Sequence, residues 1–155
     1  MGVVLGLVRL GLRPADVGAA WDELAAAGDG TVLLAEQLEA ELELIVGAYR
    51  DASFGPLVTI GIGGIAAEIF ADMVAILAPP EPGEVSTAVA QLAGHRLLKG
   101  IRGGPPIDLE ALETIVNVVA EAIVSDPEIA EIDCNPVMVC SGKPIVADAL
   151  VVLDN

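Results

Sequence analysis

Three oxygen-bearing side chains near the C-terminal end of the sequence have the residue types and the spacing of a metal site. Asp133 and Asn135 are two positions apart, and Asp148 follows thirteen positions after Asn135. Because side chains alternate between the two faces of a strand, Asp133 and Asn135 point to the same face. The turn formers Ser141-Gly142-Lys143 predict a hairpin that brings Asp148 back toward them. Carboxylate and amide oxygens suit Mg²⁺, whose remaining ligands are waters and phosphate oxygens.

A second interpretation of these three positions stays open on spacing alone. Asp and Glu number 23 in this chain against 7 Lys and Arg, so polar residues at strand ends that face water could produce the same spacing. Pro136 directly follows Asn135. Proline cannot donate a ladder hydrogen bond, which indicates either a sheet edge or a binding site at this point.

The elements that must position these side chains follow a mixed helix and strand pattern. Helices are predicted after Pro14 as far as Gly28, over residues 85–94, and over residues 109–125 with Asp108 as N-cap. Strands are predicted over residues 3–12, 31–38, 43–49, 57–60, 129–140 and 144–153. Since no repeat or interdomain linker interrupts this pattern, residues 1–155 are expected to form a single α/β (α+β) domain.

Composition restricts the classes of partner. The net charge is −16, which repels nucleic acid and anionic lipid, so neither is an expected partner. Hydrophobic residues make up 54% of the chain and charged residues only 19%, below the usual quarter. This apolar surplus favours a homo- or hetero-oligomer.

Two further features bear on compartment and redox chemistry. Cys134 and Cys140 lack the number and spacing of a disulfide framework or a zinc site. The sequence contains no apolar run of membrane-spanning length and no basic leader, so a cytoplasmic protein is expected.

Beyond single residues, a series of motifs resembles the NDP-forming acyl-CoA synthetases, with a similar hairpin in the β subunit of succinyl-CoA synthetase. Residues 131–137 (EIDCNPV) and 146–149 (VADA) are similar to the family signature E-(L/I)-D-x-N-P-L … A-L-D-A. Further segments resemble the family in the same order along the chain: residues 8–12 (VRLGL), 43–56 (ELIVGAYRDASFGP), 61–72 (GIGGIAAEIFAD) and 97–109 (LLKGIRGGPPIDL).

This resemblance implies a fold, a ligand and a set of site residues. The fold would be the C-terminal subdomain of an ATP-grasp domain: a mixed, mostly antiparallel sheet, helices packed on one side, and a C-terminal β-hairpin. The ligand would be ATP or ADP with Mg²⁺. Its implied contacts are Asn135 and Asp148 as metal ligands with Asp133 beside them, Glu43 facing the nucleotide, and Gly61, Gly63, Gly64 and Arg102 near the phosphates.

The implied reaction moves a phosphoryl group between the nucleotide and an acyl-CoA-forming centre through a phosphorylated histidine, which requires a CoA-binding, phosphohistidine-bearing domain or subunit. His95 is the only histidine. It does not match a family phosphohistidine, and we expect an exposed imidazole near a helix end. No catalytic residue is assigned, and neither the acyl substrate nor the nucleotide base follows from the sequence.

Departures from the family pattern indicate an incomplete site. The lysine-bearing N-terminal subdomain of the family corresponds to nothing in this chain. Ala71, Ile76 and Gly104 stand where the family usually has basic residues. Because cations stabilise the transferred phosphoryl group, the chain is expected to be incomplete or inactive alone.

Two other functions remain in consideration. One is a degenerate, non-catalytic oligomerisation or interaction domain. The other is a dinucleotide-binding module, since Gly61-x-Gly63-x-x-Ala66 follows a predicted strand and Glu81 lies about twenty residues further on. Residues 65–73 have helical periodicity, whereas the resemblance implies extended chain after the glycine loop, and we follow the resemblance. Magnesium-dependent nucleotide binding, NAD binding and the absence of both would separate the three functions.

Overall fold

The computed structural model describes residues 6–64, 72–101 and 103–154. Predictions for residues 1–5, for residues 65–71 after the glycine loop, and for Arg102 lie outside the described residues. The chain divides into two compact units, residues 1–38 and residues 39–155, which we describe in turn.

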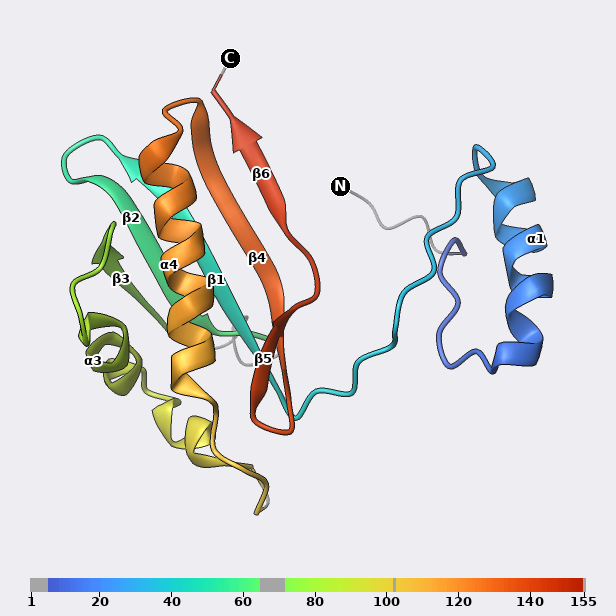
Figure 1. The fold of residues 1–155 in the computed structure, drawn as a ribbon, viewed down its shortest axis with the longest axis horizontal. Helices are drawn as coiled ribbons and strands as arrows, with labels where there is room; N and C mark the ends of the chain where they lie inside the picture. The colour runs from blue at the N-terminus through green and yellow to red at the C-terminus, as the bar shows by residue number, and fades with distance from the viewer. Residues whose placement is uncertain (1–5, 65–71, 102, 155) are drawn as a thin grey trace. The chain divides into compact units, whose positions relative to one another are not determined.

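The larger unit contains a six-stranded sheet, as Figure 1 shows. The strand order is β3 (Met73–Leu77), β2 (Gly55–Ile62), β1 (Leu42–Asp51), β4 (Ile129–Cys140) and β5 (Lys143–Val146), and β6 (Leu150–Leu153) also pairs with β4. Every strand pairing among the described residues is antiparallel. The predicted mixed α and β class with a mostly antiparallel sheet is thus confirmed.

Two α-helices cover one face of this sheet: α3 (Glu84–Gln91) packs on β3 and β2, and α4 (Leu109–Ser125) packs on β1, β2 and β4. The buried side chains alternate along the strands, as the period of a strand requires when one face is covered. On β1 and β2 they are Leu44, Val46, Ala48, Val58, Ile60 and Ile62. They meet Leu112, Val116 and Ile123 of α4, and burying each large aliphatic side chain contributes about 1.5–3 kcal/mol.

Both ends of α4 are fixed by side chains. Asp108 accepts a hydrogen bond from the Ala111 amide at 3.0 Å, which confirms the predicted N-cap. At the other end Arg50 of β1 donates hydrogen bonds from Nε to the Ile129 carbonyl at 2.8 Å and from Nη2 to the Asp126 carbonyl at 2.7 Å. Nη2 also donates to the carbonyl of Ile123. Arg50 therefore satisfies carbonyls that the helix end leaves unpaired.

A side chain also stabilises the β1–β2 turn. The Asp51 carboxylate accepts hydrogen bonds from the amides of Ser53 at 2.8 Å and Phe54 at 2.9 Å. These bonds, the one from Phe54 first, hold the pKa of Asp51 below its ordinary value, because they favour the charged form.

The hairpin of β4 and β5 closes through Ser141 and Gly142, whose φ angles are 50° and 80°. Two consecutive positive φ values are typical of the two-residue turn that suits the twist of paired strands. Only glycine fits at the second position, since a Cβ there would lie 2.5 Å from the Pro106 carbonyl oxygen. The predicted turn is confirmed, but the predicted strand 144–153 is wrong in detail, because residues 147–149 separate β5 from β6.

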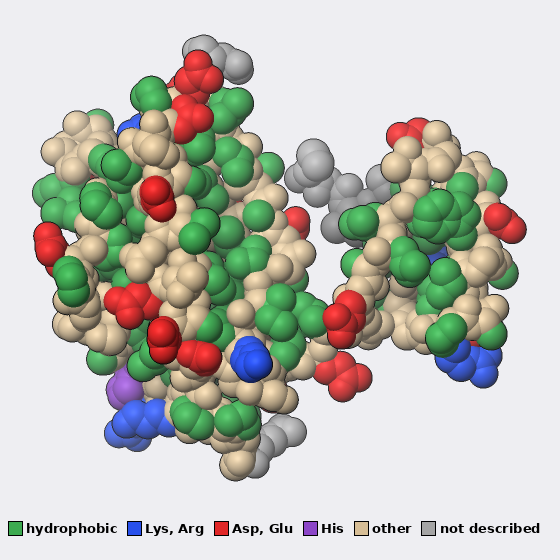
Figure 2. All heavy atoms as spheres, in the orientation of Figure 1, with side chains coloured by type: hydrophobic (Ala, Val, Ile, Leu, Met, Phe, Trp, Pro, Cys, Tyr) green, Lys and Arg blue, Asp and Glu red, His purple; other side chains and the backbone are tan. Residues whose placement is uncertain are grey.

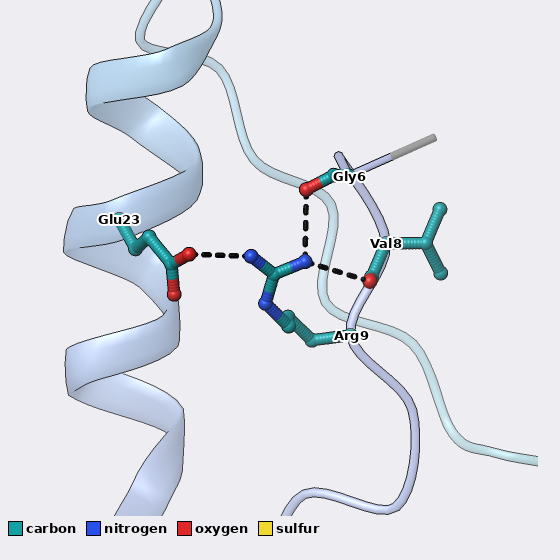
Figure 3. A network of polar contacts seen from close by, with 4 residues as sticks. All are labelled: Gly6, Val8, Arg9 and Glu23. Carbon is teal, nitrogen blue, oxygen red and sulfur yellow. Dashed lines mark hydrogen bonds and ion pairs between the residues drawn. The ribbon is translucent and has the colours of Figure 1, made fainter. Parts of the chain in front are cut away.

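The smaller unit contains the short 3₁₀ helix η1 (Pro14–Asp16) and α1 (Val17–Ala27), which ends at Gly28 as predicted. Figure 3 shows Arg9, which pairs with Glu23 of α1 and donates to the carbonyls of Gly6 and Val8 at 2.8 and 3.0 Å.

The strands predicted over residues 3–12 and 31–38 are wrong for the residues that the structure describes, which form no strand at 6–12 or 31–38. A strand requires a neighbour for its amides and carbonyls, and within this unit the two segments meet instead through the Gly11 amide and the Gln37 side chain. They line a cavity of about 530 Å³ beside α1, which is largely apolar.

The antiparallel pairing of β2 with β3, with Leu57 opposite Leu77, corrects the dinucleotide-binding alternative. A dinucleotide fold needs the strand after the glycine loop to return parallel to the first strand. Met73 lies in β3 rather than in a helix, and the preceding residues 65–71 are not described.

Candidate functional site

The face of the sheet opposite α3 and α4 carries the candidate site. It contains a hollow of about 310 Å³ to which four strands contribute. The residues that line it are Ile45, Gly47, Ala48, Tyr49, Thr59, Met73, Glu131, Ile132, Asp133 and Asn135. Among these described residues two are carboxylic acids and none is Lys or Arg, so the hollow is electrostatically negative.

Gly47 keeps the floor of this hollow open. It lies opposite Thr59 on one side and Asp133 on the other. A Cβ at this position would lie 3.0 Å from both the Thr59 hydroxyl oxygen and the Ile132 carbonyl oxygen. Any larger residue would therefore crowd the sheet between Thr59 and Asp133, and glycine leaves that space to a ligand or to water.

The register of β4 on either side of Asn135 bears on the position of Asp148. Val137 is opposite Val146 in β5, and Asp133 is opposite Leu150 in β6. Extending either register by two residues leads to Asn135 in β4 and Asp148 in the β5–β6 connection, where residues 147–149 form no strand. A hydrogen bond of 3.1 Å from the Ala147 amide to the Pro136 carbonyl holds the intervening segment against β4.

The three predicted ligand residues differ in their surroundings. Asp133 is half-buried and lines the hollow with Asn135, which is exposed. Asp148 is exposed and does not line the hollow. It lies in the connection between β5 and β6, and its Oδ1 accepts a hydrogen bond from the Ala149 amide at 2.9 Å.

The chemistry of the three predicted ligand side chains decides whether they suit a divalent cation. No group of three or more His, Cys, Asp and Glu side chains in the described part of the chain is arranged to hold a metal. Asp133, Asn135 and Asp148 include two such residues and an amide. Two carboxylates and one amide oxygen suit Mg²⁺, which normally keeps several waters and shares phosphate oxygens rather than occupying an all-protein cage.

Glu43 lies against the glycine loop at the end of β2. The Gly63 amide donates a 2.7 Å hydrogen bond to the Glu43 carbonyl. A Cβ on Gly63 would lie 3.2 Å from the same carbonyl, and a Cβ on Gly64, whose φ is +66°, would lie 3.3 Å from Glu43 Oε2. A Cβ on Gly61, near the end of β2, would lie 3.0 Å from the Asp72 carbonyl oxygen. The structure thus brings Glu43 together with Gly63 and Gly64, whereas Gly61 lies against Asp72 and Met73.

Asp72 supports the far side of this loop. Its carboxylate accepts hydrogen bonds from the amides of Ala93 at 2.8 Å and Gly94 at 2.7 Å, directly after α3. Its backbone carbonyl accepts from the Ile62 amide at 3.0 Å. Asp72 therefore ties the start of β3 to the end of α3.

Sequence reasoning missed the lining residues Ile45, Gly47, Ala48 and Ile132, and also four whose side chains are long or polar: Tyr49, Thr59, Met73 and Glu131. Strand alternation carried a signal for two of them, because Tyr49 shares a face with Glu43 and Glu131 shares a face with Asp133. The other two required knowledge of which strands are neighbours.

Two further residues that could do chemistry, Cys134 and His95, have contacts that support the fold. Cys134 is 5% exposed on the helix-covered side, and burial together with the Asp133 charge raises the pKa of its thiol. His95 begins the 3₁₀ helix η2 (His95–Lys99) with its Nδ1 2.8 Å from the Leu92 carbonyl oxygen. Its ring is half-buried rather than exposed as predicted.

No helix within the described residues is both long enough and apolar enough to cross a membrane.

Comparison with known proteins assigns the family. The family model for the ATP-grasp domain matches residues 5–153. The chain is 31% identical over 157 residues to the ADP-forming acetate–CoA ligase I of Archaeoglobus fulgidus, covering 96% of this chain and 23% of that protein. It is 36% identical over 122 residues to the β subunit of ADP-forming acetate–CoA ligase I of Pyrococcus furiosus, covering 79% of this chain and 53% of that subunit.

Solved structures give the same result. The dinucleotide-forming acetyl-coenzyme A synthetase 1 of Ca. Korarchaeum cryptofilum, in complex with coenzyme A, acetyl-coenzyme A and a phosphorylated phosphohistidine segment, has a TM-score of 0.84 and 32% identity over 98% of this chain and 72% of its own. Its complex with coenzyme A and Mg-AMPPCP has a TM-score of 0.80 and 32% identity, covering 94% of this chain and 67% of its own. This chain spans 23% and 53% of the lengths of the two curated relatives. With a family match along almost its whole length, the chain belongs to the ATP-grasp family and is similar to the ATP-grasp domains of NDP-forming acyl-CoA synthetases.

Proposed function

We propose that this chain forms the Mg²⁺- and nucleotide-binding part of an ADP-forming acyl-CoA synthetase. The observation that carries the proposal is the hollow that Asp133 and Asn135 line, and the strand pairings on either side of Asn135 support the approach of Asp148 to it. The related synthetase with bound Mg-AMPPCP supports the choice of ligand.

Asp133, Asn135 and Asp148 supply the oxygen ligands in this proposal, with the exposed Asp148 contributing from the connection between β5 and β6. Bound Mg²⁺ would supply positive charge between these side chains and the nucleotide phosphates. That charge is needed here, because the chain carries a net charge of −16 and repels a free polyphosphate.

Glu43 and the glycine loop form the adjoining nucleotide contact. The absence of side chains at Gly61, Gly63 and Gly64 lets a phosphate or ribose approach the backbone in this proposal. An added Cβ would crowd the Glu43 carboxylate at Gly64 and the Glu43 backbone at Gly63. Arg102 contributes a guanidinium to the same cleft in this proposal, as a charge-assisted donor to phosphate oxygens.

The acyl-CoA-forming reaction needs residues outside this sequence. We infer that a lysine-bearing subdomain and a phosphohistidine-bearing, CoA-binding domain complete the site, within a longer chain or as another subunit. The largely apolar segments at residues 6–12 and 31–38, which form no strand ladder, support this part of the proposal, because unpaired backbone beside apolar side chains suits the addition of neighbouring strands. Alone, the chain is expected to bind nucleotide weakly and to turn nothing over.

A non-catalytic interaction domain is the second candidate. Ile76 and Gly104 favour it, because they stand at positions where the related enzymes usually have cations. Ile76 packs against the hydrophobic core from β3. An apolar, packed side chain therefore stands at the position where the related enzymes usually have a cation.

Calorimetric titration with ATP in the presence and absence of Mg²⁺ tests the proposal. The variants are Asp148→Ala and, as a control of equal charge change, Asp154→Ala, an exposed residue beyond the end of β6. We expect metal-dependent heat in the unmodified chain and in Asp154→Ala, and at least a tenfold weaker affinity in Asp148→Ala. Equal metal-dependent binding by both variants would contradict the assigned ligand. Failure of the unmodified chain to bind ATP with or without Mg²⁺ would favour the non-catalytic candidate.

A further inference from the structure

Asp72 connects two segments that are distant in the sequence and that meet beside the candidate site. Its Oδ1 accepts a hydrogen bond from the Ala93 amide at 2.8 Å, and its Oδ2 accepts one from the Gly94 amide at 2.7 Å. Hydrogen bonds of this length to an ionised carboxylate are about twice as strong as those between neutral groups. Each carboxylate oxygen thus has its own backbone donor, which fixes the side chain of Asp72 to the segment that follows α3.

The backbone of Asp72 carries this constraint to the glycine loop. Its carbonyl accepts a hydrogen bond from the Ile62 amide at 3.0 Å, and a Cβ on Gly61 would lie 3.0 Å from the same carbonyl oxygen. The following amide, that of Gly63, donates to the Glu43 carbonyl at 2.7 Å. A series of contacts therefore runs from the end of α3 through Asp72 to the backbone beside Glu43.

Close packing at Gly94 makes this series of contacts sensitive to small changes. A Cβ at Gly94 would lie 3.0 Å from Asp72 Oδ2 and 3.1 Å from Ile62 Cγ1. The φ angle of Gly94 is −82°, outside the left-handed region, so a side chain there meets a steric obstacle rather than backbone strain. Gly94 therefore packs directly against both Ile62 and Asp72.

The segment that binds Asp72 leads into one of the few cationic stretches of this chain. η2 begins directly after Gly94 and carries Arg96 and Lys99 in its last turn. Figure 2 shows Lys, Arg and His side chains gathered at the surface over η2. Because Lys and Arg number only 7 against 23 Asp and Glu, this stretch favours a charged carboxylate over a neutral amide at position 72.

We propose that Asp72 is a positioning residue of the nucleotide site, which holds the glycine loop beside Glu43 while other residues contact the nucleotide and the metal. Met73, the next residue, lines the hollow, so Asp72 adjoins both parts of the candidate site. In the sheet order, β2 and β1 separate β3 from β4, which carries Asp133 and Asn135, so the metal ligands are held by other contacts. The inference rests on the proposed function for the identity of the ligand, but the contacts of Asp72 can be tested without a ligand.

Amide hydrogen exchange of the full chain, followed by NMR without nucleotide or metal, tests whether Asp72 holds the loop. The disrupting variant is Asp72→Asn, because asparagine keeps one acceptor oxygen and turns an NH₂ donor toward the other backbone amide. The matched control is Asp51→Asn. The Asp51 carboxylate also accepts two backbone amides, but it lies at the β1–β2 turn, at the opposite end of β2 from the glycine loop.

We expect the amides of Ile62 and Gly63 to exchange faster by about tenfold or more in Asp72→Asn, and at unchanged rates in Asp51→Asn. Local opening accelerates exchange only in the region that opens, so the amides that pair β1 with β4 should keep their protection. Unchanged exchange of Ile62 and Gly63 would overturn the proposal. Equal acceleration across the whole sheet would also overturn it, since that result indicates a general loss of stability.

Calorimetric titration separates positioning of the loop from metal binding. Mn²⁺ alone should bind Asp72→Asn as tightly as it binds the unmodified chain, because the substitution leaves the metal ligands in place, whereas Mg-ATP should bind Asp72→Asn at least fivefold more weakly. Equal Mg-ATP affinities, together with accelerated exchange, would make Asp72 a purely structural residue and overturn the proposal. Failure of the unmodified chain to bind Mg-ATP would refute the proposed function instead, and the exchange rates would still decide whether Asp72 holds the loop.

A second variant, Gly94→Ala, keeps the test decisive if asparagine disturbs folding. The added methyl group presses on Asp72 Oδ2 and on the Ile62 side chain but leaves the carboxylate charge in place. We expect faster exchange of the Ile62 and Gly63 amides and weaker Mg-ATP binding in this variant. Gly18→Ala is the control, because a Cβ at Gly18 meets nothing within 4 Å. Equal exchange rates in the two alanine variants would overturn the role of this contact.

Discussion

Replacement of Arg50 by methionine tests the interaction between β1 and the C-terminal end of α4. The substitution keeps an aliphatic stem but removes hydrogen bonds to the carbonyls of Ile129, Asp126 and Ile123. Hydrogen bonds to a charged group contribute about 1.5–3 kcal/mol each, and a cation near a helix C-terminus adds about 0.3–1 kcal/mol. Arg50 is only half-buried, so water partly replaces the lost donors. We therefore expect a loss of about 2–4 kcal/mol.

Urea unfolding measures this loss in the larger unit. Tyr49 is the only tyrosine and lies in β1, whereas the only tryptophan, Trp21, lies in α1 of the smaller unit, so the two residues report on different units. With a slope of about 1–3 kcal/mol per molar urea, the midpoint should fall by roughly 1–2 M. Arg96→Met is the control, because Arg96 is exposed in η2 and its side chain donates no hydrogen bond within the part of the chain that the structure describes. A shift no larger than that of Arg96→Met would refute the capping role of Arg50.

Two further predictions concern the glycine loop and the β1–β2 turn. Gly64→Ala should destabilise the chain by about 1 kcal/mol. The reason is that φ of Gly64 is +66° and an added Cβ would lie 3.3 Å from Glu43 Oε2. An unchanged melting temperature would contradict this backbone conformation. Asp51, whose pKa is lowered by the amides of Phe54 and Ser53, contributes stability that is present above its unfolded pKa and is lost as the pH falls through its lower folded pKa. Asp51→Asn should therefore reduce the loss of stability on acidification. Unfolding is measured between pH 5 and pH 2, about the range over which carboxylates titrate. Identical pH profiles for the variant and the unmodified chain would contradict the assignment.

Local sequence determined the elements whose signals lie within a few residues of one another. The apolar stripe of α4 with its N-cap Asp108, the end of α1 at Gly28, and the Ser141-Gly142 turn were all predicted and are present. Helix periodicity, caps and tight turns are set by contacts between near neighbours in the chain. The family motifs also carried the ATP-grasp assignment that the comparisons confirm.

Tertiary structure decided everything that depends on which strands are neighbours. The segments 6–12 and 31–38 have the apolar pattern of strands but form none in the described residues, because a strand exists only when another backbone pairs with it. The break between β5 and β6, and the registers of the two strands on either side of Asn135, arise from pairing with β4. The hollow arises in the same way, since Gly47 lies between Thr59 and Asp133 only in the assembled sheet. Residue types and spacing named the candidate ligands, but hydrogen bonding between distant strands determined which of them face one another.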